Sequence, residues 1–179
     1  MTKIIMTGMA FFLVIFLSTA YGGWDPRDRE DEERAVKETV SLLLSVDPSL
    51  QIYFDKAYAY AVLPTVGKGA FIGGVGYGRG WFFESGKPIG KVSIAQLSAG
   101  AQIGGQSYRE IVFFRDKDRA EDFKAGRFEF GGQLSAIVVT EGVGKAGTYT
   151  DGVAVFILPR AGFMAEASVS GQRFDFEPF

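Results

Sequence analysis

A run of glycines at a strict spacing of two residues constrains this fold more than any other feature of the sequence. The four glycines are Gly74, Gly76, Gly78 and Gly80. On a strand, side chains alternate between the two faces, so these glycines leave one face bare while the odd-numbered residues from Val75 to Trp81 occupy the other. A bare face lets another backbone lie very close, or lets a sheet coil sharply. The sequence therefore predicts a bent, closely packed β structure here.

Composition supports packed β structure and excludes several classes of chemistry. The 24 glycines are accompanied by 17 Phe, 7 Tyr and 2 Trp, with only 6 prolines, which is not the pattern of a flexible linker. The chain has no histidine, cysteine or asparagine. This excludes disulfides, thiol nucleophiles, Ser-His triads and His or Cys metal sites. We therefore expect no cofactor, no metal site and no enzymatic activity.

Residues 1–20 have the pattern of a secretory signal peptide. Lys3 is their only charge, an apolar run extends from Ile4 to Leu17, and Ser18 and Ala20 suit a cleavage site. An uncleaved N-terminal anchor is the alternative. Loss of Lys3 would leave 18 basic and 21 acidic side chains, a net charge of −3, which does not favour nucleic acid as a partner. We expect an exported protein of the periplasm or cell envelope, with residues 21–179 forming one domain.

Capping signals and periodicity predict a helix-then-sheet order along the chain. Asp25-Pro26 and Asp47-Pro48 are helix start signals, the first for a helix ending near Val46 and the second for a short helix to about residue 57. Asp118 with Glu121 resembles a capping box, and Gly126 suits the end of that helix. A turn is expected at 85–88. Strands are expected near 58–63, 74–83, 92–105, 108–114, 133–140, 152–158, 163–169 and 174–176.

Three motifs could in principle carry chemistry, but each has an ordinary structural interpretation. The run 142–147 matches G-x-G-x-x-G, but turn and strand residues follow it, which favours a glycine-rich turn over a dinucleotide site. Asp116 and Asp118 begin like a calcium loop, but the later ligand positions are absent, which favours a helix N-terminus. Glu84 and Glu110 could in principle form a glycosidase pair, although ion pairs are the more ordinary role for such acids.

The middle of the chain is basic, although the protein is acidic. Residues 56–115 carry seven basic and two acidic side chains, whereas residues 25–55 have a net charge of −5 and residues 116–179 of −3. Lysine and arginine attract anionic headgroups, and tryptophan favours the membrane interface. The candidate lipid-binding residues are Lys68, Arg79 and Lys87 for headgroups, and Trp81 and Phe82 for the interface. The alternative is that the aromatic residues form core and the lysines are ordinary solvated charges.

Several short motifs follow one another along the chain: Ala61-Val-Leu-Pro64, Gly67-Lys-Gly-Ala-Phe-Ile-Gly-Gly74, Tyr77-Gly-Arg-Gly80, Ser98-Ala-Gly-Ala-Gln-Ile-Gly-Gly-Gln106, Tyr108-Arg-Glu-Ile-Val-Phe-Phe114, Ala120-Glu-Asp-Phe123 and Phe163-Met-Ala-Glu-Ala-Ser-Val-Ser-Gly171. In this order they resemble the SYLF domain family, whose members bind lipids. The resemblance extends from about residue 31 to 177. The sequence departs from the family pattern at 84–88, at Lys91-Val-Ser-Ile-Ala95 and at Thr140-Glu-Gly-Val-Gly144.

The resemblance implies an α+β fold with a curved or barrel-like, mostly antiparallel sheet decorated by a few helices. It also implies binding to anionic phospholipid membranes without enzymatic activity. Actin is a partner of eukaryotic relatives, but an exported chain would not meet it. The alternative function is an envelope interaction protein that recruits a protein partner through an exposed sheet edge or through the acidic N-terminal helix.

Overall fold

One seven-stranded sheet, in the order β5-β6-β4-β1-β2-β3-β7, organises the protein. The computed structural model describes residues 26–68, 75–97, 106–127, 136–161 and 172–179. The strands are β1 (Ala59–Lys68), β2 (Val75–Glu84), β3 (Lys87–Leu97), β4 (Gln106–Phe114), β5 (Ile137–Val138), β6 (Val153–Ala161) and β7 (Gln172–Pro178). All neighbouring strands are antiparallel except the short parallel pair β5–β6. The predicted α+β class is confirmed, whereas the predicted strand at 163–169 lies outside the described residues.

Local signals predicted the positions of the described helices, except for the one at 143–146, where a turn was expected. They are α1 (Pro26–Val46), the 3-10 helix η2 (Pro48–Leu50), α2 (Gln51–Lys56), α3 (Lys117–Lys124) and α4 (Val143–Ala146). The chain divides into two units, residues 1–31 and 32–179, and α1 crosses the boundary. The second unit contains the rest of α1, the whole sheet and the other helices. The predicted signal peptide lies outside the described residues.

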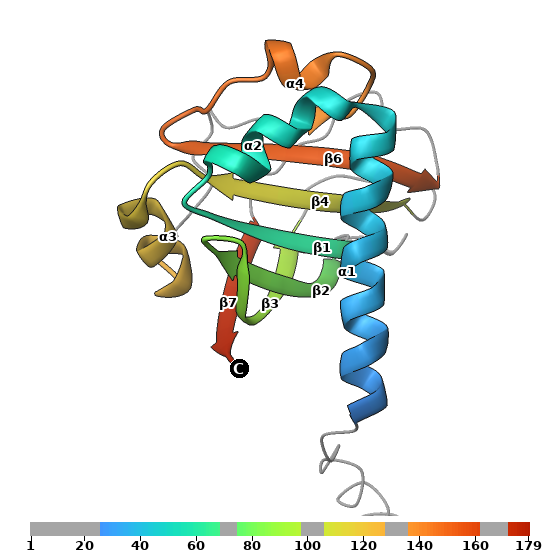
Figure 1. The fold of residues 1–179 in the computed structure, drawn as a ribbon. Helices are drawn as coiled ribbons and strands as arrows, with labels where there is room; N and C mark the ends of the chain where they lie inside the picture. The colour runs from blue at the N-terminus through green and yellow to red at the C-terminus, as the bar shows by residue number, and fades with distance from the viewer. Residues whose placement is uncertain (1–25, 69–74, 98–105, 128–135, 162–171) are drawn as a thin grey trace, which may run out of the picture. The chain divides into compact units, whose positions relative to one another are not determined.

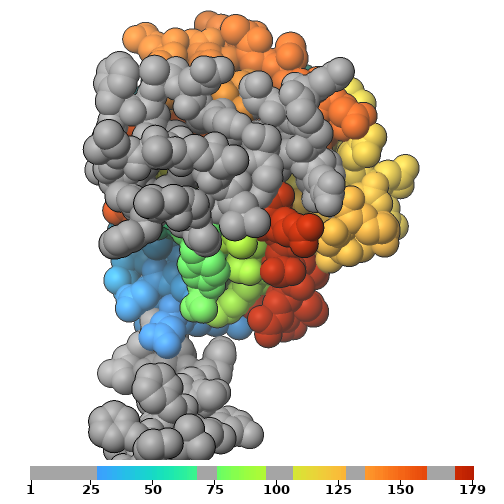
Figure 2. Space-filling model, turned by 180° about the vertical axis from the view of Figure 1, so that it is seen from behind, coloured from blue at the N-terminus to red at the C-terminus, as the bar shows by residue number. Residues whose placement is uncertain are grey.

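Helices cover both faces of the sheet in the second unit. On one face, which we call the outer face, Leu43 of α1 and Tyr53 of α2 pack with Ile111 and Phe113 of β4. On the inner face, Phe123 of α3 belongs to the same cluster as the alternate β4 residues, such as Val112. In Figure 1, β6 and β4 run across the view whereas β7 runs down it, so the sheet is strongly coiled. Figure 2 shows β2, β3 and β7 side by side, with α3 next to β7.

The glycine face of β2 is filled by the backbone of the neighbouring strand. A Cβ on Gly80 would lie 1.9 Å from the carbonyl oxygen of Val62, and one on Gly78 would lie 2.7 Å from that of Thr65. Between these two positions the β1–β2 register shifts. The close backbone approach and the sharp coiling that the glycine spacing predicted therefore occur together. Gly74 lies outside the described residues.

Strand β1 continues past the proline at which it was predicted to end. The register of β1 with both β2 and β4 is interrupted around Pro64 and then resumes, so that Lys68 lies opposite Gly76. Proline has no N–H to donate to a ladder, and a bulge accommodates it within a strand. The prediction that the strand ends at Pro64 was therefore wrong, because a proline there interrupts pairing without ending it.

The cap of α3 differs from the predicted one by two residues. The carboxylate of Asp116, not that of Asp118, accepts the backbone N–H of Arg119 at 3.1 Å. Asp118 lies inside the first turn, where its charge acts only through the helix dipole. Gly126 follows the helix with φ of +66°, as its predicted role at the helix end requires.

This assignment predicts unequal effects for the two aspartates. Asp116→Ala should lower the free energy of unfolding by about 1 kcal/mol, because the N–H of Arg119 loses its acceptor. Asp118→Ala should cost only a few tenths of a kcal/mol, the size of an exposed charge–dipole interaction. Urea denaturation of both variants measures the difference. A larger loss for Asp118→Ala would contradict the assignment.

Candidate functional site

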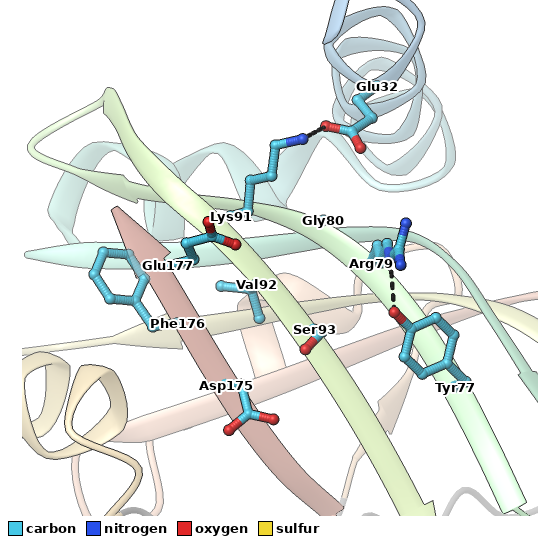
Figure 3. A pocket seen from close by; sticks show the side chains of 10 residues that line it. All are labelled: Glu32, Tyr77, Arg79, Gly80, Lys91, Val92, Ser93, Asp175, Phe176 and Glu177. Atoms are coloured by element: carbon cyan, nitrogen blue, oxygen red, sulfur yellow. Dashed lines mark hydrogen bonds and ion pairs between the residues drawn. The ribbon is translucent and has the colours of Figure 1, made fainter. Parts of the chain in front are cut away.

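A pocket of about 340 Å³ lies on β2, β3 and β7, beside the part of α1 that begins at Glu32 (Figure 3). It contains one of the predicted headgroup residues, Arg79, and combines cations with carboxylates. Its lining residues are Glu32, Tyr77, Arg79, Gly80, Lys91, Val92, Ser93, Asp175, Phe176 and Glu177.

Arg79 is held in place by a tyrosine two residues before it. Odd-numbered residues of β2 face outward, so Tyr77 and Arg79 are neighbours on one face. The Nε–H of Arg79 donates to the Tyr77 hydroxyl at 2.6 Å (Figure 3), and this hydrogen bond raises the pKa of Arg79 above its usual value. Both side chains are exposed. In the described part of the chain, no carboxylate forms an ion pair with Arg79, so its terminal amino groups can meet an anion.

Lys91, by contrast, is already neutralised. Its Nζ lies 2.8 Å from a carboxylate oxygen of Glu32, which also accepts the indole N–H of Trp81 at 3.3 Å. Strand β7 adds two further acids, because Asp175 lies opposite Ser93 and Glu177 lies opposite Lys91. The pocket therefore has two cations and three carboxylates. The basic middle of the sequence does not form a uniformly basic pocket, because the fold brings Glu32, Asp175 and Glu177 next to it from distant parts of the sequence.

The two predicted interface aromatics are buried. Trp81 is 3% exposed and belongs to the cluster beneath the helices of the outer face, and Phe82 is fully buried on the inner face. The Phe82 ring stacks on that of Phe123, with centroids 5.4 Å apart. We correct the predicted roles of Trp81 and Phe82 accordingly: in this structure both rings form core. Alternation along β2 also places them on opposite faces, so they cannot enter one surface together.

The predicted basic residues lie in separate places. Lys87 is exposed at the tip of the β2–β3 hairpin, opposite Glu84, which is about 17 Å along the strand from Arg79. The turn residues between them, Ser85 and Gly86, have positive φ, as expected for the predicted turn. Lys68 is the last residue of β1, and its side chain lies outside the described part of the structure.

Two exposed aromatic residues were not predicted to belong to this surface. Tyr77 is 50% exposed and Phe179 is 46% exposed. The Phe179 and Trp81 rings meet edge to face, with centroids 5.0 Å apart. The sequence could have indicated that Tyr77 belongs to this surface, because residues two apart on a strand share a face and Tyr77 lies two residues before Arg79. Phe179 carries no sequence signal, because its place follows from the pairing of β7 with β3.

The two acids of the basic middle do not form a catalytic pair. Glu84 accepts the Tyr58 hydroxyl at 2.6 Å and contacts Lys124 at 3.1 Å, and these bonds hold its pKa below the usual range against the effect of burial. Glu110 is fully buried and accepts the Gln172 amide at 3.0 Å. Glu84 and Glu110 lie on strands at either side of β1, offset by about 13 Å along it. Glycosidase carboxylates are about 5–9.5 Å apart.

The G-x-G-x-x-G motif forms helix α4 rather than the predicted turn. Gly142 has φ of +81°, and the helix that follows has only four residues. The backbone N–H of Gly144 donates to the carboxylate of Asp47 at 2.6 Å, so a phosphate could not use this donor. Among the described residues, no group of acids is arranged to hold a metal ion, and no helix has the length and apolar character needed to cross a membrane.

Comparison with known proteins supports the family resemblance in the second half of the chain. Residues 95–177 match the family Ysc84, described as "Las17-binding protein actin regulator" and equivalent to SYLF. The chain is also similar to "Beta cell expansion factor A" of Aeromonas veronii, with 29% identity over 141 residues. That alignment covers 74% of this chain and 51% of the relative, so the chain spans about half the relative's length. The motifs at 61–80 lie before the range of the family match.

Proposed function

We propose that this chain, which carries a SYLF domain over residues 95–177, is an exported, non-enzymatic protein of the cell envelope that binds anionic phospholipid membranes. The observation that carries the proposal is the exposed Arg79, oriented by Tyr77 and without an ion pair in the described structure. A guanidinium with unused donors suits a phosphate oxygen in both charge and geometry.

The exposed residues around Arg79 support contact with a membrane surface. Tyr77 and Phe179 present aromatic rings on the outer side, where they could enter the interfacial layer. Lys87, at the hairpin tip, supplies a second cation at some distance from the first. The carboxylates of Asp175 and Glu177 oppose this attraction, so we expect modest affinity that depends strongly on salt.

Vesicle co-sedimentation tests the proposal. The chain should bind vesicles rich in phosphatidylglycerol at low salt, and much less at high salt or to phosphatidylcholine alone. Arg79→Ala with Lys87→Ala should weaken binding roughly 10- to 30-fold, at about 1 kcal/mol for each basic residue near the surface. Adding Lys68→Ala tests the third predicted headgroup residue.

A matched pair of substitutions controls for net charge. Lys117 and Arg127 are exposed cations at the two ends of α3, away from the pocket. Lys117→Ala with Arg127→Ala removes the same charge and should leave vesicle binding nearly unchanged. Equal weakening by both double variants would show nonspecific attraction. Absence of binding to every vesicle would overturn the proposal and favour a protein partner for this surface.

A further inference from the structure

A second pocket lies at the opposite end of the sheet from Arg79. It has a volume of about 530 Å³ and is formed by η2 and α2 on one side and by α4 and the residues after it on the other. Figure 1 shows α2 and α4 over β6, which is three strand spacings from β2, about 14 Å. No predicted site residue belongs to this pocket. Its volume is within the range of small-molecule sites, which is about 300–1,000 Å³.

The body of this pocket is apolar and aromatic. The ring centroids of Tyr53 and Tyr149 lie 5.4 Å apart, so the two rings are in contact and form one aromatic wall. Ile52, at the edge of the pocket, is 46% exposed. Gly147 packs closely against the Tyr53 ring, because a Cβ at this position would lie 2.8 Å from the Tyr53 hydroxyl. The walls would therefore accept an alkyl chain or an aromatic ring.

Polar groups at the pocket are suited to a single anionic group. Lys56 ends α2 and Lys145 lies in the last turn of α4; both line the pocket, and neither has an ion-pair partner in the described structure. The buried hydroxyl of Tyr149 has no hydrogen-bond partner among the described residues. Burial raises the pKa of Tyr149 to about 12, so this hydroxyl stays protonated and can donate. Two cations thus border an apolar cavity, and one unused donor is buried in its wall.

We propose that this pocket binds a small anionic amphiphile, with its alkyl or aryl body against the wall formed by Tyr53 and Tyr149 and its single anionic group at Lys56 and Lys145. The site is distinct from the proposed membrane surface and needs no vesicle. A medium-chain carboxylate and an alkyl phosphate share the required chemistry, and they differ in headgroup charge and size.

Titration of the full chain with decanoate, decyl phosphate and 1-decanol, each below its micelle concentration or solubility limit, tests this site. Saturable binding by calorimetry is expected for the anions, with decanol at least tenfold weaker. Comparison of the two anions shows which headgroup the lysines prefer.

Substitution of both lysines tests their role. Lys56→Ala with Lys145→Ala should weaken binding of the anions at least tenfold and leave binding of decanol unchanged.

Two further arms separate this site from the membrane surface. The Arg79→Ala, Lys87→Ala double variant should bind decanoate as tightly as the unaltered chain. Amide chemical-shift changes should concentrate in residues 49–56 and 143–149. Absence of saturable anion binding, equal binding by the lysine double variant, or shift changes centred on β2 and β3 would each overturn the proposal. Loss of vesicle binding alone would not affect it.

Discussion

Replacing Gly80 with alanine should lower the free energy of unfolding by about 4 kcal/mol or more, or prevent folding, because the new methyl group has no space. Its position would be 1.9 Å from the Val62 oxygen and 2.9 Å from the Cα of Leu63. Both are backbone atoms of β1, which cannot rotate away as a side chain would. Ordinary overpacking costs about 1–3 kcal/mol, and larger losses indicate a specific backbone conflict. Urea denaturation monitored by circular dichroism measures the effect.

Gly67→Ala is the matched control for this substitution. Gly67 lies in the neighbouring strand, a Cβ there would meet nothing within 4 Å, and its φ is not positive. Alanine should therefore change stability by less than about 1 kcal/mol, and a small gain is expected because alanine has less freedom in the unfolded chain. If Gly80→Ala were as mild as Gly67→Ala, β1 could not lie as close to β2 as the structure places it.

The features that sequence predicted best are those decided within a few neighbouring residues. The Asp-Pro signals located the starts of α1 and η2, and the turn expected at 85–88 is found at 85–86, between β2 and β3. Local sequence signals mispredict an element's boundary where two nearby residues could play the same role, or where strand pairing overrides the local preference. Asp116 and Asp118 could each cap α3, and only the geometry selects Asp116. Pro64 ended a strand pattern, yet the two adjacent strands keep β1 paired beyond it.

The candidate site was harder to predict because its surface depends on contacts between distant segments. The alternation of side chains along β2 correctly predicted that Arg79 and Trp81 share the face opposite the glycines. Their different exposure depends on tertiary packing, which buries Trp81 and brings Glu32 to accept its indole N–H. The same packing returns Glu32, Asp175 and Glu177 to a region whose own sequence is basic. Charge counted along the chain therefore overestimated the positive potential of the folded surface.

Asp47 connects η2 to α4, a contact that the sequence did not predict, and replacing Asp47 should lower the free energy of unfolding substantially. Its carboxylate accepts the Ser49 hydroxyl at 2.7 Å, the Ser49 backbone N–H at 3.0 Å and the buried Gly144 N–H at 2.6 Å. Asp47→Ala removes the cap of η2 and leaves the Gly144 donor unsatisfied. We expect a loss of about 3 kcal/mol in the free energy of unfolding, since bonds to charged groups contribute about 1.5–3 kcal/mol. Asp55→Ala, at an exposed carboxylate bonded only to Gln51 in the described structure, should cost less than about 0.5 kcal/mol.

The contribution of Asp47 should also depend on pH. Burial opposes ionisation of its carboxylate, but the hydrogen bonds from Gly144 and Ser49 prevail and lower its pKa below the ordinary 3.8. The stabilisation is therefore complete above the pKa of the unfolded chain and is lost as pH falls through the lower folded value. Asp47→Asn cannot ionise, so its deficit relative to the unaltered chain should be constant from about pH 5 to 7 and should shrink below about pH 4. Urea denaturation of both chains at pH 7, 5 and 3 measures it. A deficit that grows with acidity would show that Asp47 is protonated in the folded state.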